Sequence, residues 1–322
     1  MYDAVQVRDM PVLAAAAVVI ARCKRRPLYY WMSYPMPEGQ IELARQRRLS
    51  AGVMKFLYPW ISGHAGRWLL RHWVLPRASH LFVQSPVMKQ ELLTLGVPGE
   101  RITPVLMGVD LEAVKPEELQ AIEDPRLAGR RVIAYLGTLD RSRRIEGLFA
   151  MLSRVRLREP RALLLIVGDT DDDVHRRWLR ERAEEAGVAE HVIWTGWLPT
   201  REGWRWLRTA EVALSPFPRG PLLDSASPTK VPEYLALGLP VVCNDNPDQR
   251  SVIEVSGAGR CVPYTPEDFA GAVVELLNLP AGERERMRVA GLRYVQEHRD
   301  YRRIAEQVAV QYRRLAAAAM QK

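Results

Sequence analysis

Short apolar runs alternate along the chain with longer stretches in which an apolar residue recurs every three or four positions. Residues 162–167 contain no polar side chain, which is typical of a strand buried on both faces of a parallel sheet. Residues 240–243 also read as a short buried strand, whereas residues 176–186 and 268–277 have the helical period. Strands that alternate with helices predict an α/β fold with parallel sheets.

The first third of the chain contains its own strand and helix candidates. We predict strands at residues 4–7, 28–32 and 80–85, and helices at 10–21 and 86–95. Residues 33–76 are polar and aromatic, and we expect a loop and one or two helices there. The chain ends in a predicted helix at 301–319, where Ile304, Val308 and Tyr312 recur at intervals of four.

The predicted elements fall into two groups. Residues 116–129 are rich in Glu and Pro and sustain no period, so they predict a linker. We therefore expect a first domain at 1–115, a second domain at 130–296 and a C-terminal helix within 297–322. A chain of 322 residues is long enough for two such cores.

Composition narrows the class of protein. The chain is 48% hydrophobic and 26% charged, which favours a compact soluble protein. Cys23, Cys243 and Cys261 are scattered and odd in number, so the sequence predicts neither a disulfide framework nor a zinc cluster and favours a reducing cytoplasm. The apolar run at 10–21 is too short for a membrane span, and its positive charges follow it, unlike those of a signal peptide.

The net charge of +8 is concentrated in one region. Between residues 22 and 77 only Glu38 and Glu42 oppose the following cations: Arg22, Lys24, Arg25, Arg26, Arg45, Arg47, Arg48, Lys55, Arg67, Arg71 and Arg77. Interleaved aromatic residues are Trp31, Phe56, Tyr58, Trp60, Trp68 and Trp73. This mixture predicts contact with an anionic membrane, at the inner face of the plasma membrane. Nucleic acid is disfavoured because no binding motif accompanies the charges, and the aromatic residues can alternatively form core.

Residues 227–242 carry the most specific candidate chemistry. Lys230 and Glu233 stand at the start of a predicted helix that Gly238 ends. Free amides at a helix start and the Lys230 ammonium favour a diphosphate, and the Glu233 carboxylate can accept hydrogen bonds from two ribose hydroxyls. The alternative is a capped helix with a solvated Lys and Glu.

This segment resembles the donor-binding signature of the retaining glycosyltransferases of family 4. Further segments resemble that family in the expected order, at residues 135–144, 162–169, 192–199 and 212–217. The resemblance implies the glycosyltransferase-B fold, with two Rossmann-like α/β domains that face a cleft and a C-terminal helix that crosses back to the first domain.

The same resemblance implies the site residues. Arg143, six residues after Gly137, matches a phosphate-binding position, and with Lys230 it is the predicted catalytic pair; the alternative for Arg143 is a solvated arginine. The predicted donor-binding residues are Gly137, Thr138, Gly196, Trp197, Leu198, Ser225, Thr229 and Glu233.

The chain departs from the family pattern in three places. The family signature contains two Glu residues. The second corresponds to Glu233, but the position of the first is occupied by Ser225, beside Asp224. A first-domain His is replaced by Ser33 or Tyr34. The opening strand and glycine-rich loop have no counterpart before Tyr2, so we expect an incomplete first domain, explained by a late start codon, by a partner chain that supplies the strands, or by a remnant enzyme.

A diphosphate leaving group needs its charge neutralised by a metal or by fixed cations. Asp171, Asp172 and Asp173 are better explained as the start of a helix, where acidic residues are favoured. We therefore expect no metal site and no cofactor beyond the donor substrate.

These observations favour a metal-independent hexosyltransferase that uses a nucleotide diphosphate sugar and a glycan or lipid-linked acceptor. The alternative is a catalytically weak subunit that binds the nucleotide sugar and assists a partner, which Ser225 and the short first domain favour. Epimerisation of a nucleotide sugar is a third, weaker hypothesis.

Overall fold

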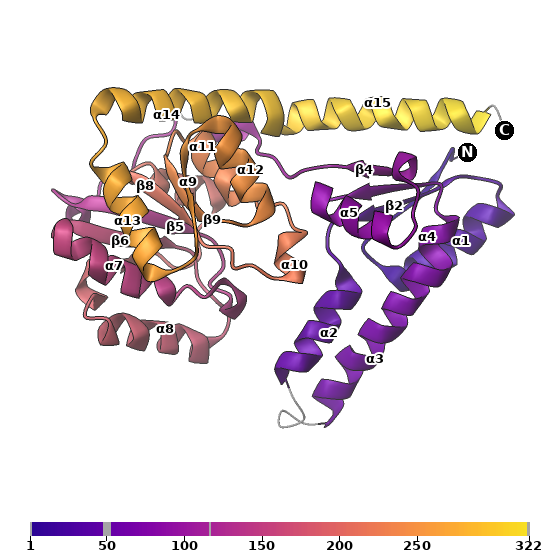
Figure 1. Ribbon diagram of the computed structural model, residues 1–322, viewed down its shortest axis with the longest axis horizontal. Coiled ribbons are helices and arrows are strands. Elements are labelled where there is room, and N and C mark those ends of the chain that lie inside the picture. Colours follow the sequence, from indigo (N-terminus) through magenta and orange to yellow (C-terminus); the bar gives the residue numbers. More distant parts are fainter. Residues whose placement is uncertain (1, 48–52, 116, 321–322) are drawn as a thin grey trace. The chain divides into compact units, whose positions relative to one another are not determined.

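The computed structural model describes residues 2–47, 53–115 and 117–320 (Figure 1). They form two compact units. Unit 1 comprises residues Met1–Leu106, Gly220–Ser227 and Ala305–Lys322, and unit 2 comprises Met107–Arg219 and Pro228–Ile304. Arg48, from the predicted basic region, and Pro116, from the predicted linker, lie outside the described residues.

Unit 1 is built on a four-stranded parallel sheet in the order β1-β2-β3-β4. Its strands are β1 (Val5–Arg8), β2 (Leu28–Met32), β3 (His80–Val83) and β4 (Ile102–Pro104). Val7, Tyr30, Leu81 and Ile102 form one row across the sheet. The strands predicted at 4–7, 28–32 and 80–85 are confirmed.

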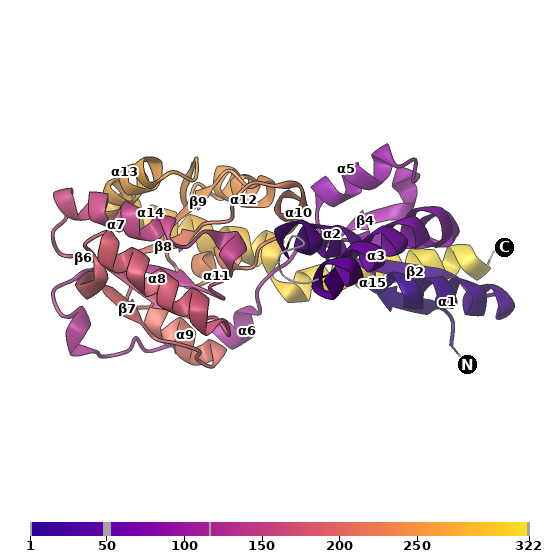
Figure 2. The same cartoon turned by 90° about the horizontal axis from the view of Figure 1, so that it is seen from below.

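The helices of unit 1 follow the strands. They are α1 (Pro11–Cys23), α2 (Met36–Arg47), α3 (Val53–Leu69), which continues through a π-helical turn (Leu70–Val74) into α4 (Leu75–Arg77), and α5 (Pro86–Thr94). The short elements are a 3₁₀ turn at Gly99–Arg101 and α10 (Pro221–Asp224). Helices α2 and α3 lie side by side and extend together away from the sheet of this unit (Figures 1 and 2). The region that we expected to hold a loop and one or two helices is therefore largely helical.

The last helix, α15 (Tyr301–Met320), supplies an aromatic cover for the unit 1 sheet. Its residues from 305 onward group with unit 1. The Tyr312 ring centroid lies 5.7 Å from Tyr29 and 5.0 Å from Phe82, and Trp31 Nε1 donates to Tyr312 Oη at 2.9 Å. Trp31 also stacks on Phe82, so its assignment to a membrane-facing surface was wrong.

Unit 2 contains a six-stranded parallel sheet in the order β10-β9-β8-β5-β6-β7. The strands are β5 (Arg131–Leu136), β6 (Ala162–Val167), β7 (Val192–Trp194), β8 (Val212–Ser215), β9 (Val241–Asn244) and β10 (Gly259–Val262). Read from β7, this is the doubly wound order 3-2-1-4-5-6, which reverses between β5 and β8. Ligands of such sheets bind beyond the carboxyl ends of the strands at that switch point.

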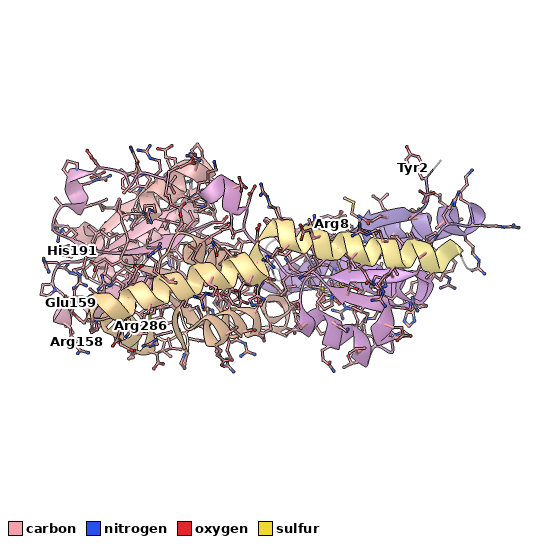
Figure 3. All side chains as sticks on the ribbon, turned by 90° about the horizontal axis from the view of Figure 1, so that it is seen from above. Tyr2, Arg8, Arg158, Glu159, His191 and Arg286 are labelled. Atoms are coloured by element: carbon pink, nitrogen blue, oxygen red, sulfur yellow. The ribbon has the colours of Figure 1, made fainter. Side chains whose placement is uncertain are left out.

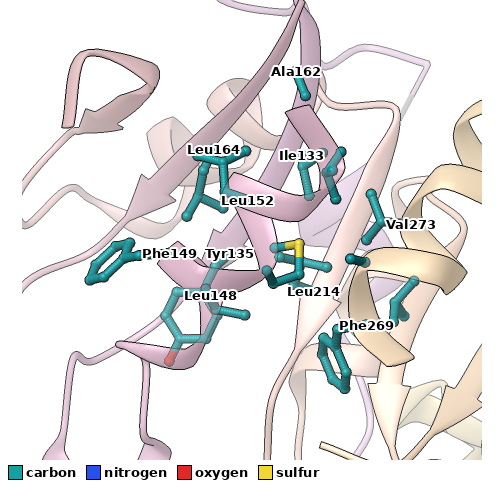
Figure 4. Packing of buried hydrophobic residues seen from close by; sticks show 14 of the residues in the cluster. Ile133, Tyr135, Leu148, Phe149, Leu152, Ala162, Leu164, Leu214, Phe269 and Val273 are labelled. Carbon is teal, nitrogen blue, oxygen red and sulfur yellow. The ribbon is translucent and has the colours of Figure 1, made fainter. Parts of the chain in front are cut away.

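Helices cover both faces of the unit 2 sheet. One face packs against α7 (Gly147–Arg158), α8 (Asp173–Glu185) and α13 (Pro266–Leu277), and the other against α9 (Thr200–Leu207), α11 (Lys230–Ala236), α12 (Pro247–Ser256) and the end of α14 (Ala281–Tyr294). Alternate residues of β5 enter the two cores: Ile133 and Tyr135 pack with Leu148 and Phe149 of α7 on the first face (Figure 4). The apolar run predicted as a strand buried on both faces, residues 162–167, is β6, and all six of its residues are buried.

Unit 2 also includes the predicted linker. Helix α6 (Leu111–Val114) precedes it, and a 3₁₀ turn (Pro125–Leu127) lies within it. Leu119 is buried and packs into the unit 2 core. Further short turns are 3₁₀ at Arg141–Arg143 and Ala189–His191, and π-helical at Val295–Arg299. The described linker residues therefore pack on unit 2, to which they belong.

The two ends of unit 2 are fastened to one another by backbone and by a buried ion pair. Val109 forms an isolated bridge with Asp300. Arg299, which is 1% exposed, donates to Asp248 Oδ1 at 2.6 Å and to the Met107 carbonyl at 3.0 Å. Gly108 lies so close that a Cβ there would be 2.3 Å from the Arg299 carbonyl oxygen.

Candidate active site

The site begins where β5 ends. Gly137 directly follows this strand with φ of +141°, a conformation that favours glycine. Its amide donates to the Val167 carbonyl at 2.9 Å. Gly168, the residue after β6, approaches so closely that a Cβ there would lie 2.2 Å from the Gly137 carbonyl oxygen. The two glycines therefore let bare backbone stand at the carboxyl edge of the sheet.

Lys230 lies over this bare backbone. It is the first residue of α11, and a Cβ at Gly137 would lie 2.6 Å from its Nζ. The Nζ also lies 5.5 Å from the Tyr135 ring centroid. Tyr234 Oη accepts a hydrogen bond from the Leu136 amide at 2.8 Å and thereby ties α11 to the end of β5. Lys230 is thus held at the switch point by its own helix.

Arg143 brings a second cation to the same end of the sheet. Its guanidinium carbon lies 4.0 Å from the Phe217 ring centroid, in cation–π contact. Phe217 follows β8 and is fixed by Asn244, which accepts from its amide at 2.6 Å and donates to its carbonyl at 2.8 Å. The loop that carries Arg143 starts at Asp140, which caps the Ser142 amide at 2.7 Å. Arg143 is therefore placed by packing, contrary to the alternative of a solvated arginine.

The electrostatics of this cluster favour an anion. Burial and the nearby Arg143 lower the pKa of Lys230 to about 8, against a smaller opposing effect of Glu233. Burial raises the pKa of Glu233, and the Lys230 charge counteracts that rise. A negatively charged ligand would reduce the repulsion between two cations that are held close together at a partly buried site.

The loop after β7 supplies a different surface. Gly196 has φ of +72° and bridges Gly168, and Trp197 after it is 52% exposed. Leu198 instead packs against the unit 2 core. Gly196 also lines a hollow of about 230 Å³, together with Gly168, Asp169, Arg176, Arg180, Trp194 and Thr195. A larger hollow of about 560 Å³ contains none of the predicted site residues. It is lined by Ile122, Glu123, Asp124, Pro125, Leu127, Ala128, Arg130, Val132 and Thr209.

The two predicted threonines flank the cluster. Thr138 is exposed, and its carbonyl accepts from Tyr135 Oη at 3.1 Å. Thr229 is the N-cap residue of α11, and its carbonyl accepts the first hydrogen bond of the helix, from the Glu233 amide at 3.0 Å. The structure thus brings Gly137, Arg143, Lys230 and their neighbours to one edge of unit 2.

Ser225 belongs to unit 1, unlike the residues of this cluster. It is fully buried, its hydroxyl donates to the Leu222 carbonyl at 3.2 Å, and its own carbonyl accepts from Ser85 Oγ at 2.6 Å. Its predicted contact with the donor sugar stays a prediction.

Asp9 is a polar residue at the edge of the unit 1 sheet that the sequence did not single out. It follows β1 with φ of +57° and accepts from the Ser33 and Tyr34 amides at 2.7 and 3.0 Å and from Ser33 Oγ. Its position two residues after the strand predicted at 4–7 was the available signal. Among the first-domain histidines, His80 is buried and bonded to Thr103 at 2.8 Å, a structural role, whereas His64 and His72 are exposed.

The acidic run at residues 171–173 starts a helix, as predicted. Asp172 is the N-cap of α8 and accepts from the Val174 and His175 amides at 3.0 Å each. Within residues 2–47, 53–115 and 117–320, His, Cys, Asp and Glu side chains form no group of three or more that could hold a metal ion. The same described residues contain no helix that is both long and apolar enough for a membrane span.

The fold is that of known glycosyltransferases. Over 98% of this chain and 74% of the other, it superposes on sucrose-phosphate synthase from Thermosynechococcus elongatus with a TM-score of 0.71 and 18% identity. HepE from Anabaena in complex with UDP and glucose matches 97% of this chain and 77% of its own with a TM-score of 0.66 and 15% identity. Trehalose 6-phosphate synthase from Burkholderia multivorans matches 98% and 72% with a TM-score of 0.71 and 16% identity.

Two parallel α/β units with these neighbours define the glycosyltransferase-B fold, which confirms the predicted fold class. Residues 130–279, which include the whole cationic cluster, match the sequence model of the family described as glycosyl transferases group 1. The predicted resemblance to glycosyltransferases is thereby confirmed for this part of the chain. No curated protein matches the sequence.

Proposed function

We propose that this protein is a retaining glycosyltransferase that moves a hexose from a nucleotide diphosphate sugar to a hydroxyl of a glycan or lipid-linked acceptor. The observation that carries the proposal is the pair of fixed cations at the switch point, Lys230 over the bare backbone of Gly137 and Arg143 against the Phe217 ring. The structure of HepE contains UDP, and a similar trehalose-phosphate synthase is named as UDP-forming. Both support a uridine nucleotide as donor.

In the proposed reaction, the bond between the sugar C1 and the diphosphate oxygen breaks while the acceptor oxygen bonds to C1 on the same face. Lys230 and Arg143 stabilise the negative charge that develops on the leaving diphosphate. The acceptor hydroxyl proton passes to an oxygen of that diphosphate. The cations thus fill the role that a metal ion has in other transferases, and we propose that the reaction is metal-independent.

Glu233→Ala is expected to weaken UDP binding by about 1.5–3 kcal/mol, the range for hydrogen bonds to a charged group. The variant lacks the half-buried carboxylate and therefore the proposed hydrogen bonds with the ribose hydroxyls. Isothermal titration of UDP in chelator measures the change, with Glu254→Ala on the exposed side of α12 as the matched control. If chelation abolished binding and magnesium or manganese restored it, metal independence would be refuted; equal affinities for Glu233→Ala and the control would reduce Glu233 to a helix-start residue.

Binding of UDP is expected to weaken as the pH rises from 7 to 9. Because the pKa of Lys230 lies at about 8, the free enzyme loses the ammonium charge in this window, whereas the bound diphosphate favours the protonated form. One pH unit above that pKa, affinity should be lower by about tenfold. Titration calorimetry across this range measures the dependence, which Lys230→Met should remove; an equally steep dependence in that variant would exclude Lys230 as its source.

The alternative function, a donor-binding subunit with weak catalysis, is favoured by Ser225, whose buried hydroxyl is bonded within its own turn. A transfer assay with the isolated chain separates the two, since the subunit would bind UDP without turnover. Both share the binding site, so the titrations above apply to either.

A further inference from the structure

The outer face of α3 exposes apolar side chains along its whole length. Seven large apolar residues there have between 37% and 75% of their surface exposed: Val53, Met54, Leu57, Tyr58, Trp60, Ile61 and Trp68. At about 100° per residue, Leu57, Ile61 and Trp68 fall on nearly one line along the helix. Polar residues normally occupy the solvent face of a surface helix, so this pattern is inverted.

The opposite face of α3 fixes this orientation. Pro59, Gly63 and Gly66 are buried. A Cβ at Gly63 would lie 2.6 Å from Ile41 Cγ1 and 2.9 Å from the Pro37 carbonyl oxygen, both in α2. This close contact leaves no room for a rotation that would turn the apolar line inward. The line therefore faces away from α2, with which α3 lies side by side (Figure 2).

The surrounding charge is positive. Residues 36–77 contain seven Arg and Lys residues against Glu38 and Glu42. Both acids are neutralised within the unit: Glu38 lies 3.1 Å from Arg67 and 3.9 Å from Arg71, and Glu42 lies 3.8 Å from Arg45. The segment that carries the apolar line therefore has a surplus of positive charge.

The structure also narrows the aromatic surface predicted from the sequence. Trp73 donates to the Ala15 carbonyl at 3.3 Å and packs against two unit 1 cores, so its assignment to the membrane surface was wrong. Trp60 and Trp68 remain exposed and pair with His64 and His72, at ring separations of 4.6 and 5.7 Å. Rings that have an apolar body and a polar edge suit the interface between headgroups and acyl chains.

We propose that the outer face of α3 docks on an anionic membrane surface. The helix lies in the interface plane, with Leu57, Ile61 and Trp68 toward the acyl chains and the cations at headgroup level. Lipid is favoured over a protein partner because the apolar line lies in a segment with a surplus of positive charge, and the two together complement an anionic bilayer. The inference does not depend on the donor chemistry proposed above.

The test is flotation of the full chain with vesicles of phosphatidylcholine, alone or mixed with phosphatidylglycerol. Binding is expected only with the anionic lipid and is expected to weaken with salt. Ile61→Ser with Trp68→Ser should reduce the bound fraction by about tenfold or more, because the anchoring area is lost. The matched control is Val12→Ser with Ile20→Ser, which removes two exposed apolar side chains from α1 of the same unit.

Equal recovery with neutral and anionic vesicles, or no flotation at low salt, would overturn the proposal. Equal loss in the two double variants would also overturn it, provided that circular dichroism shows both to be folded. Light scattering tests whether a second copy of the chain binds this face instead. A dimer that becomes monomeric in the α3 double variant, but not in the α1 control, would assign the face to a second copy of the chain.

Discussion

Replacement of Lys230 by Ala is expected to lower the rate of glycosyl transfer by about 10²–10³-fold, the loss that follows removal of one preorganised donor from a developing negative charge. Lys230 is suited to this role because α11 and Tyr234 hold its ammonium against Gly137, where no reorganisation is needed as the diphosphate leaves. Arg143 remains in the variant, so residual activity is expected.

Initial rates with UDP-sugar donors measure this loss. Arg158→Ala is a suitable control. Arg158 is exposed at the end of α7 (Figure 3), and its replacement removes one positive charge from the same unit. Thermal unfolding checks that Lys230→Ala is folded. Because burial disfavours the charge of Lys230, its removal is not expected to destabilise the protein. A folded Lys230→Ala protein with the rate of the control would remove Lys230 from the reaction.

Asp248→Asn is expected to destabilise the protein by about 3–5 kcal/mol, because it leaves the buried Arg299 guanidinium without a compensating charge. Arg299 is 1% exposed and the Asp248 side chain 5% exposed, so water cannot replace the lost carboxylate. The amide keeps the volume of the carboxylate, which separates the effect of charge from that of a cavity.

Guanidinium unfolding of unit 2 measures the change. Asp245→Asn is the matched control, since Asp245 pairs with Arg219 at 3.0 Å and Arg250 at 3.3 Å on the surface and should cost only about 0–1 kcal/mol. The double variant Asp248→Leu with Arg299→Met should recover much of the loss, because a buried pair is often replaceable by apolar residues. Similar midpoints for the two Asn variants would mean that water reaches Arg299.

Much of unit 2 could be predicted because its signals are local. The apolar run of β6 admits only a buried strand, and Gly238, with φ of +76°, ends α11 where the sequence placed the stop. The start of α8 at Asp172 follows from its cap. The helix start at Lys230 and the glycine after β5 were recognisable for the same reason.

The contacts that complete the site are not local. Arg143 meets Phe217 only because the sheet order places β5 beside β8, which a linear pattern does not specify. A buried arginine such as Arg299 contradicts the usual preference of charged residues for the surface, and its partner is 51 residues away. In the aromatic region, tertiary packing leaves Trp60 exposed and turns Trp73 toward the Ala15 carbonyl, which the sequence pattern does not specify.

The fastening of residues 107–109 to 299–300 has a consequence for protein engineering. Because these segments meet, the start and finish of unit 2 are a hydrogen bond apart, as they are in domains that tolerate circular permutation or insertion into a host loop. Unit 2 is therefore suited to permutation or transfer as a separate domain, provided that Arg299 and the Met107 carbonyl are kept together and that residues 220–227, which belong to unit 1, are replaced by a short connection.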